Sequence, residues 1–181
     1  MPSSEIAVII TLAIVAIAGV CWILIRRRRS EHLRHRFGPE YDSVTKEHGN
    51  QRRAEAVLET REKRVERLHI HPLTPKDRDH FAQAWQADQA RFVDDPEGAV
   101  TEADLLVTEV MKARGYPLSD FEQRVADISV DHPNVIENYR AAAAIAQRHR
   151  RGEATTEDLR QAMVFYRKLF DDLLETVEVR R

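Results

Sequence analysis

The residues of this chain best suited to acid–base or metal chemistry form two acidic motifs that contain a proline. They are Asp94-Asp95-Pro96-Glu97 and Asp131-His132-Pro133. Paired carboxylates can exchange protons with a substrate or bind a divalent cation. The same residue types are typical of a helix start, because an Asp side chain caps the first turn and a proline fits its first position. We favour the capping interpretation for both motifs, since it explains them without a ligand.

Histidine is the second residue type that suggests a site. The chain has eight histidines, and two close pairs are His69 with His71 and His32 with His35. A zinc site needs about four converging ligands, or three beside an open position. The sequence has no His-Glu-x-x-His motif, and Cys21 is its only cysteine. We therefore expect no bound metal.

Nucleophilic catalysis has little support in the sequence. Asp131 beside His132 could assist a nucleophile, but no activated Ser or Cys can be named with the pair. A glycine-rich phosphate loop, a nucleotide fingerprint and a Ser-His-Asp order are missing, and the chain has only six glycines. We therefore expect a protein that is not an enzyme and that holds no cofactor.

Tyrosine and arginine gather in two segments, residues 114–117 and 138–140. Both residue types are typical anchors of protein interfaces, although they are also ordinary surface residues. We expect any partner surface to begin in these segments. The candidate residues are Arg114, Tyr116, Asn138 and Arg140.

Helices must position these residues, because no strand pattern competes with the helical one. Alternating apolar residues and Asn-Gly or Asp-Gly turns are missing. Caps, prolines and glycines mark about five helices after residue 71, and the short breaks between them favour antiparallel neighbours in a bundle. The expected helices run from Pro75 to about Val93, from Pro96 to Gly115, from the capping-box motif at Ser119 to the break at Asp131, from Val135 to Gly152, and from Thr155 or Thr156 onward.

Apolar residues three or four apart predict which side of each helix is buried. We expect a core that includes Phe81, Trp85, Phe92, Ala99, Ala103, Leu106, Val110, Phe121, Val125, Ile128, Val135, Tyr139, Ala142, Ala146, Leu159, Met163, Tyr166, Phe170, Leu173 and Val177.

Residues 51–68 read as a charged helix with a short heptad seam. Ala54, Leu58, Val65 and Leu68 form the seam, and Arg61 occupies the position where an apolar residue is missing. A stalk that packs on the bundle fits this pattern better than an independent coiled coil. Dimerisation through the seam remains open, and so does the order of residues 30–49.

The longest apolar run of the chain extends from Ile6 to Ile25 and contains one polar side chain, Thr11. As a helix it is about 30 Å long, which matches the hydrocarbon core of a bilayer. A cleaved signal peptide is the alternative, but the run is too long and no Lys or Arg precedes it. We therefore expect a permanent transmembrane helix.

Four arginines, Arg26, Arg27, Arg28 and Arg29, follow the apolar run directly. Positive residues beside a span stay on the cytoplasmic side, which predicts an outside N-terminus and a cytoplasmic C-terminal body. Trp22 fits the aromatic belt at the same interface. The expected segments are a tail (1–5), a transmembrane helix (6–25), a basic juxtamembrane linker (26–50), a charged stalk helix (51–70) and a helical bundle (71–178).

Charge divides the chain in two. Residues 1–68 carry a net charge of +4 and residues 69–181 a net charge of −6, which together give the −2 of the whole chain. An acidic body does not favour nucleic acid or the anionic inner leaflet. We expect no nucleic-acid partner, and a body that stands off the lipid and faces the cytoplasm.

Several short motifs of the body together resemble a group of uncharacterised bacterial membrane or secreted proteins. They are Arg-Phe-Val-Asp-Asp-Pro at 91–96, Arg-Gly-Tyr-Pro at 114–117, Asp-Phe-Glu-Gln-Arg at 120–124 and Ser-Val-Asp-His-Pro at 129–133. The resemblance covers about residues 75–175. It implies a bacterial source and hence an inner-membrane location, and it brings no activity with it.

The sequence therefore predicts an all-α protein with one transmembrane helix, a charged stalk helix and a compact bundle of about five helices. We expect a non-enzymatic, membrane-anchored interaction or scaffold module on the cytoplasmic face, whose partners are the lipid bilayer and either another protein or a second copy of the chain. The alternative is a membrane-tethered regulatory module that binds a small apolar ligand among its helices.

Overall fold

The computed structural model describes residues 3–175, and within α1 it describes the side chains from residue 12 onward except that of residue 15. This part of the chain consists of eight helices and contains no strand. The predicted all-α class is therefore confirmed. The helices are α1 (Ser3–Phe37), α2 (Pro39–His48), α3 (Gln51–Val65), α4 (Pro75–Arg91), α5 (Pro96–Ala113), α6 (Phe121–Asp131), α7 (Ile136–Arg150) and α8 (Thr156–Leu174).

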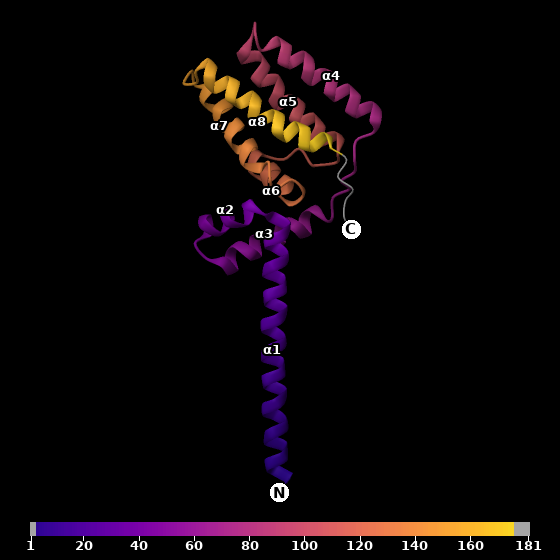
Figure 1. Ribbon diagram of the computed structural model, residues 1–181, viewed down its shortest axis with the longest axis vertical. Coiled ribbons are helices and arrows are strands. Elements are labelled where there is room, and N and C mark those ends of the chain that lie inside the picture. Colours follow the sequence, from indigo (N-terminus) through magenta and orange to yellow (C-terminus); the bar gives the residue numbers. More distant parts are fainter. Residues whose placement is uncertain (1–2, 176–181) are drawn as a thin grey trace.

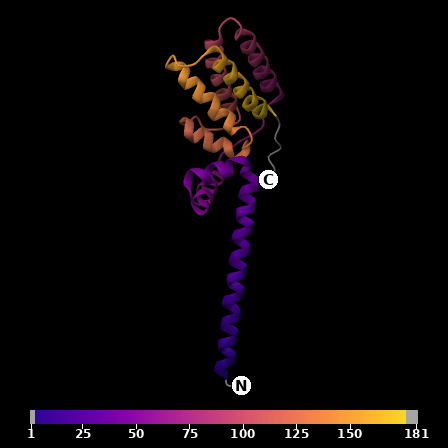
Figure 2. The same cartoon turned by 60° about the vertical axis from the view of Figure 1, so that its left-hand side comes forward.

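Helix α1 is a long rod whose N-terminal part projects away from all the other helices (Figures 1 and 2). It passes through the predicted span and the four arginines without a break and ends at Phe37. Across the described residues, none of the helices combines the length and apolar character needed to traverse a bilayer. The predicted span at 6–25 includes residues 6–11 and 15, whose side chains lie outside the described part.

The end of α1 forms a small three-helix unit with α2 and α3. We call residues 30–65 the N-terminal unit. The sequence left open whether residues 30–49 are ordered. These residues are helical except around Gly38 and Gly49. The unit has its own apolar core, to which α6 adds one side chain. The core residues are Leu33, Phe37, Tyr41, Val44, Ala54, Leu58, Val65 and Val130.

The heptad seam of α3 is the buried side of that helix. Ala54, Leu58 and Val65 are buried, and Leu68 packs against the same core. The helix packs on α1, α2 and α6 within one chain. The sequence predicted a charged helix that packs on the rest of the chain, and α3 does so through its contacts with α1, α2 and α6.

Helices α4 to α8 form the body and enclose the main core. We use "the body" for residues 73–175. Helix α8 packs between α5 and α7, and Trp85 of α4 stacks on Phe170 of α8 with ring centroids 4.6 Å apart. The predicted number of five helices is confirmed, and most of the predicted core residues are buried. Val177 lies outside the described residues.

Side-chain caps begin most helices of the body. Thr74, Asp95 and Thr155 accept hydrogen bonds from the first turns of α4, α5 and α8, as the sequence predicts. The predicted capping box at Ser119 is wrong, because Asp120 accepts the hydrogen bond from the Gln123 N–H. A carboxylate at this position also interacts favourably with the helix dipole.

Gly115 ends the turn after α5 in a conformation with φ of 94°. A Cβ atom at this position would lie 2.4 Å from the His69 carbonyl oxygen. Next to it, the His71 N–H donates to the Arg114 carbonyl at 3.0 Å. The close approach fixes the segment that leads from the N-terminal unit into the body, and only glycine combines this φ with this contact.

Candidate functional site

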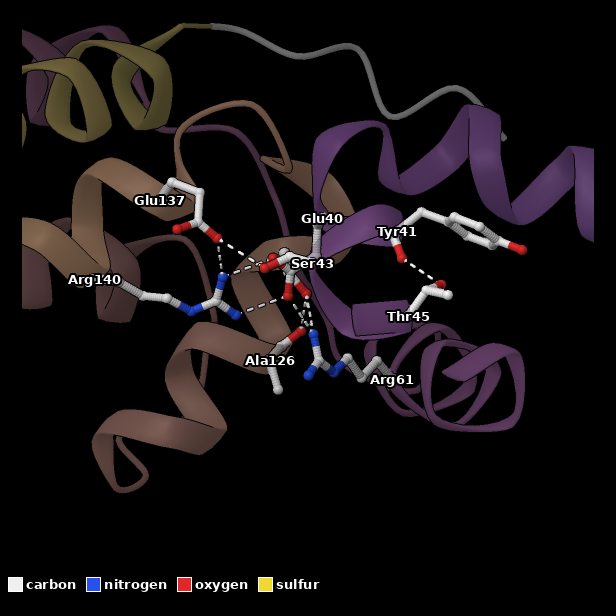
Figure 3. Close-up of polar contacts among 9 residues, drawn as sticks. Glu40, Tyr41, Ser43, Thr45, Arg61, Ala126, Glu137 and Arg140 are labelled. Carbon is white, nitrogen blue, oxygen red and sulfur yellow. Dashed lines mark hydrogen bonds and ion pairs between the residues drawn. The ribbon is translucent and has the colours of Figure 1, made fainter. Parts of the chain in front are cut away.

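The most unusual group of the chain is a fully buried carboxylate, Glu40, where the N-terminal unit meets the body. Gly38 adopts a positive φ of 46°, and Pro39 then begins α2, so Glu40 lies in the first turn of that helix. The Glu40 side chain is 0% exposed. Glu40 and Tyr41 point to opposite sides of α2, Glu40 toward α7 and Tyr41 away from it (Figure 3). A buried charge of this kind is costly unless other groups compensate it.

Two arginines from different parts of the chain compensate Glu40 (Figure 3). Arg140 of α7 donates from both terminal nitrogens to the two carboxylate oxygens, at 2.7 and 2.8 Å. Arg61 of α3 donates to the same carboxylate at 2.7 Å. Burial opposes ionisation of Glu40, but the hydrogen bonds from Arg140 and Arg61 outweigh it and lower its pKa. The Glu40 carboxylate raises the pKa of Arg140 in return.

Arg61 and Arg140 also form hydrogen bonds with residues other than Glu40, on α6 and α7. Arg61 also donates to the Ser129 hydroxyl at 3.2 Å, and Ser129 donates to the Ala126 carbonyl at 2.7 Å. Arg140 donates to Glu137 at 2.6 Å. Helices α2, α3, α6 and α7 are therefore joined through Glu40 and its two arginines, which we call the Glu40 cluster.

Two further carboxylates cross the same boundary, both on α6. Asp131 accepts from Arg36 of α1 at 2.8 Å and from the Tyr116 hydroxyl at 2.9 Å. Burial, followed by the charge of Asp131, raises the pKa of Tyr116. Asp127 accepts from Arg64 of α3 at 2.9 Å and is 1% exposed. Because every partner arginine comes from the N-terminal unit, these pairs add to the Glu40 cluster in holding that unit on the body.

The capping interpretation of Asp131 is therefore wrong, although it is confirmed for Asp95. Asp131 is the last residue of α6, and His132 follows it as the C-cap. The next helix, α7, begins at Ile136 and has no side-chain cap. Pro96 follows Asp95 directly and occupies the first position of α5, whereas a histidine separates Asp131 from Pro133.

His132 belongs to a second buried network, at the C-terminal end of α8. Its Nδ1 atom contacts the Asp172 carboxylate, and its Nε2 atom lies 3.2 Å from Nη1 of Arg114. An arginine can only donate, which assigns the proton to Nδ1 and makes Nε2 an acceptor. The Arg114 Nη1 group also donates to the Leu173 carbonyl at 2.9 Å. With a side chain 0% exposed, His132 cannot reach a substrate.

The four residues of the predicted partner surface do not share one environment: two are buried and two are partly exposed. Arg114 is 2% and Tyr116 3% exposed, so neither contributes to the surface of the body. Arg140 is partly exposed but is bound to Glu40. Asn138 is partly exposed. Trp22 and the arginines Arg27, Arg28 and Arg29 are exposed on α1, and Arg26 is partly exposed.

Glu40, Asp127 and Asp172 are the site residues that the sequence did not reveal. For Glu40 one signal was present, because Arg61 occupies a core position of the α3 seam and a buried arginine requires a carboxylate. The sequence does not show which carboxylate this is, because Arg61 and Glu40 lie on different helices, 21 residues apart.

A surface cleft of about 370 Å³ lies beside the Glu40 cluster, where α6 and α7 meet α5 and α8. Alanines of α7 and Phe121 form its apolar lining, and Arg124, Arg140 and Arg150 provide positive charge. Asp104 in the cleft accepts from the buried Tyr166 hydroxyl at 3.0 Å. Burial, followed by the charge of Asp104, raises the pKa of Tyr166. Because Asp104 and Glu122 line the cleft as well, it is suited to a polar molecule more than to an apolar one.

Within residues 3–175, no group of three or more His, Cys, Asp or Glu side chains is arranged to hold a metal ion. His69 and His71 are exposed.

Comparison with known proteins gives no relative for this chain. No family model, no curated protein and no solved structure matches it.

Proposed function

We propose that this protein is a non-enzymatic, single-pass membrane protein whose helical body is an interaction module held at a fixed orientation on the cytoplasmic face. The observation that carries the proposal is α1 itself. It is one continuous helix in which an apolar stretch, four arginines and part of the N-terminal unit follow one another without a break.

The exposed side chains of α1 support a lipid environment. Large apolar residues between 12 and 25 are 48–67% exposed, and this part of α1 projects away from the other helices except near Trp22 and Ile25, which face α3. They occur on all sides of the helix, whereas a partner protein on one side would need a single apolar stripe. Only a surrounding such as a bilayer covers every side at once. The residues are Leu12, Ile14, Ile17, Val20, Trp22, Ile23, Leu24 and Ile25.

Arg26 to Arg29 support an orientation with the body in the cytoplasm, by the positive-inside rule. With the bacterial source that the resemblance implies, the location proposed is the inner membrane.

The Glu40 cluster supports a scaffold role for the body. Charged groups in the interior are often catalytic, but here Glu40, Asp131 and His132 each contact other side chains of the chain. Their arrangement fixes one part of the fold against another. A body fixed in this way presents its surface to a partner protein, or to a second copy of the chain, at a constant height and angle above the lipid.

Regulation by a small ligand is the second candidate function. The cleft beside α7 favours it, because three arginines line this cleft of about 370 Å³. Since Asp104 and Glu122 also line the cleft, its ligand would be polar, in contrast to the apolar ligand that the sequence suggested.

Three experiments test the proposal on the intact chain. Alkaline extraction of membranes should leave the protein in the pellet, and external protease should not digest the body in intact cells. In-cell crosslinking of a C-terminally tagged copy, followed by mass spectrometry, should then yield a stoichiometric partner or a self-crosslink. Extraction into the soluble fraction, or digestion from outside, would refute the anchoring or the orientation, respectively.

A further inference from the structure

A second cleft lies where α3 meets α1, at the end of the apolar stretch. It has a volume of about 340 Å³. Trp22 and Ile25 of α1 form one side of it, and Arg26, Arg29 and Arg52 supply positive charge. The cleft therefore combines an apolar wall with a basic wall, and the two meet at the point where α1 changes from apolar to charged residues.

Both carboxylates in this cleft already have partners. Glu59 forms an ion pair with Arg29. Glu55 accepts hydrogen bonds from Ser30 at 2.7 Å and from Tyr41 at 2.9 Å. The lining then has three arginines against two carboxylates, a net charge of +1.

Arg26 and Arg52 are the two arginines of the cleft that take no part in the Arg29–Glu59 ion pair. The Arg26 guanidinium lies over the Trp22 ring, 5.5 Å from its centroid. Among the described residues, the Arg52 side chain forms no ion pair or hydrogen bond, and it is exposed. Two guanidinium groups on neighbouring helices provide the donors that a phosphate group requires.

We propose that this cleft binds the headgroup phosphate of an anionic phospholipid. The inference rests on the proposed membrane anchoring, which places Trp22 and Ile25 at the lipid interface. A phospholipid carries its phosphate directly above its acyl chains, in the same order as the arginines and the apolar residues of the cleft. Arg52 is the decisive residue, because it brings α3 into contact with the lipid surface.

The test uses the full chain reconstituted in bilayers of phosphatidylcholine and phosphatidylglycerol. Electron paramagnetic resonance of spin-labelled lipids measures the association of each lipid with the protein. The variant Arg52→Gln should lower the preference for phosphatidylglycerol about fivefold, the factor expected for one arginine at a lipid surface. Arg53→Gln is the matched control, because it removes the same charge from the next exposed residue, which does not line the cleft. It should leave the preference almost unchanged.

Four results would overturn the proposal. Equal loss of preference in both variants would show diffuse attraction to charge in place of a site. Removal of the preference by millimolar glycerol 3-phosphate in the wild type would identify a soluble phosphate as the ligand. Release of the wild-type chain from vesicles at alkaline pH would refute the anchoring as well, whereas retention of the chain without any lipid preference would refute the cleft alone.

Discussion

Replacing Glu40 by Gln should release the N-terminal unit from the body. The change keeps the shape of the side chain but removes the charge that compensates Arg61 and Arg140. Removal of one partner from a buried ion pair costs about 3–5 kcal/mol. The two arginine side chains are 16% and 29% exposed and can regain some water, so we expect about 3 kcal/mol, at the lower end of that range.

Hydrogen–deuterium exchange of the intact chain in lipid nanodiscs measures this effect locally. A loss of about 3 kcal/mol increases the opening equilibrium of α2 and α3 about a hundredfold, and their amides should exchange faster by that factor. Amides in the core of α5 and α8 should change much less. Glu137→Gln is the matched control, because Glu137 also accepts from Arg140 but is 59% exposed. We expect it to cost less than about 1 kcal/mol.

The reasoning about Glu40 fails if Glu40→Gln and Glu137→Gln have equal effects. It also fails if exchange in α2 and α3 increases less than about fivefold, which corresponds to about 1 kcal/mol.

Three further changes test other parts of the fold. Burial, followed by the charge of Glu102, raises the pKa of Asp88 to about 6, so its ionisation destabilises the native state above that pH and the penalty disappears as the pH falls toward 4. Asp88→Asn should therefore stabilise the chain by up to about 3 kcal/mol at pH 8 and have little effect at pH 4, as measured by urea unfolding; an equal effect at both pH values would contradict this. Gly115→Ala should cost more than about 1 kcal/mol, because it combines a positive φ with a Cβ contact to backbone; an unchanged melting temperature would exclude the strain. Thr155→Ala should cost about 1 kcal/mol through loss of the capping box, and a normal exchange rate at the start of α8 would argue against it.

Local signals explain why most helices of the body could be predicted from the sequence. Thr74-Pro75 and Asp95-Pro96 determine a helix start within two residues, and Gly115 determines an end, so no distant contact is required. Helix α2 was missed because its charged sequence after Gly38-Pro39 resembles a linker. Its stability depends on Tyr41 and Val44, which are buried only when α1 and α3 pack against them.

The candidate site was less predictable because its contacts are distant in sequence. Arg114, Tyr116 and Arg140 were predicted to belong to a partner surface, and the sequence could not show that Tyr116 would bind Asp131 or that Arg140 would bind Glu40. A Tyr or an Arg has the same local pattern whether its partner is a second protein or another helix of the same chain. Only the tertiary fold, which brings Glu40 to Arg140 and Asp131 to Tyr116, distinguishes the two cases.

The continuity of α1 changes how an anchored module would work. A flexible linker over residues 26–50 would let the body reach partners over a wide region. Instead, α1 continues as a helix from Arg29 to Phe37, which is about 12 Å at 1.5 Å per residue, and ion pairs of Arg36, Arg64 and Arg140 join the N-terminal unit to the body. A partner must then meet the body close to the membrane and at one orientation. Breaking the Glu40 cluster should therefore weaken partner capture even if the anchor and the body each remain folded, whereas a simple tether would be insensitive to that change.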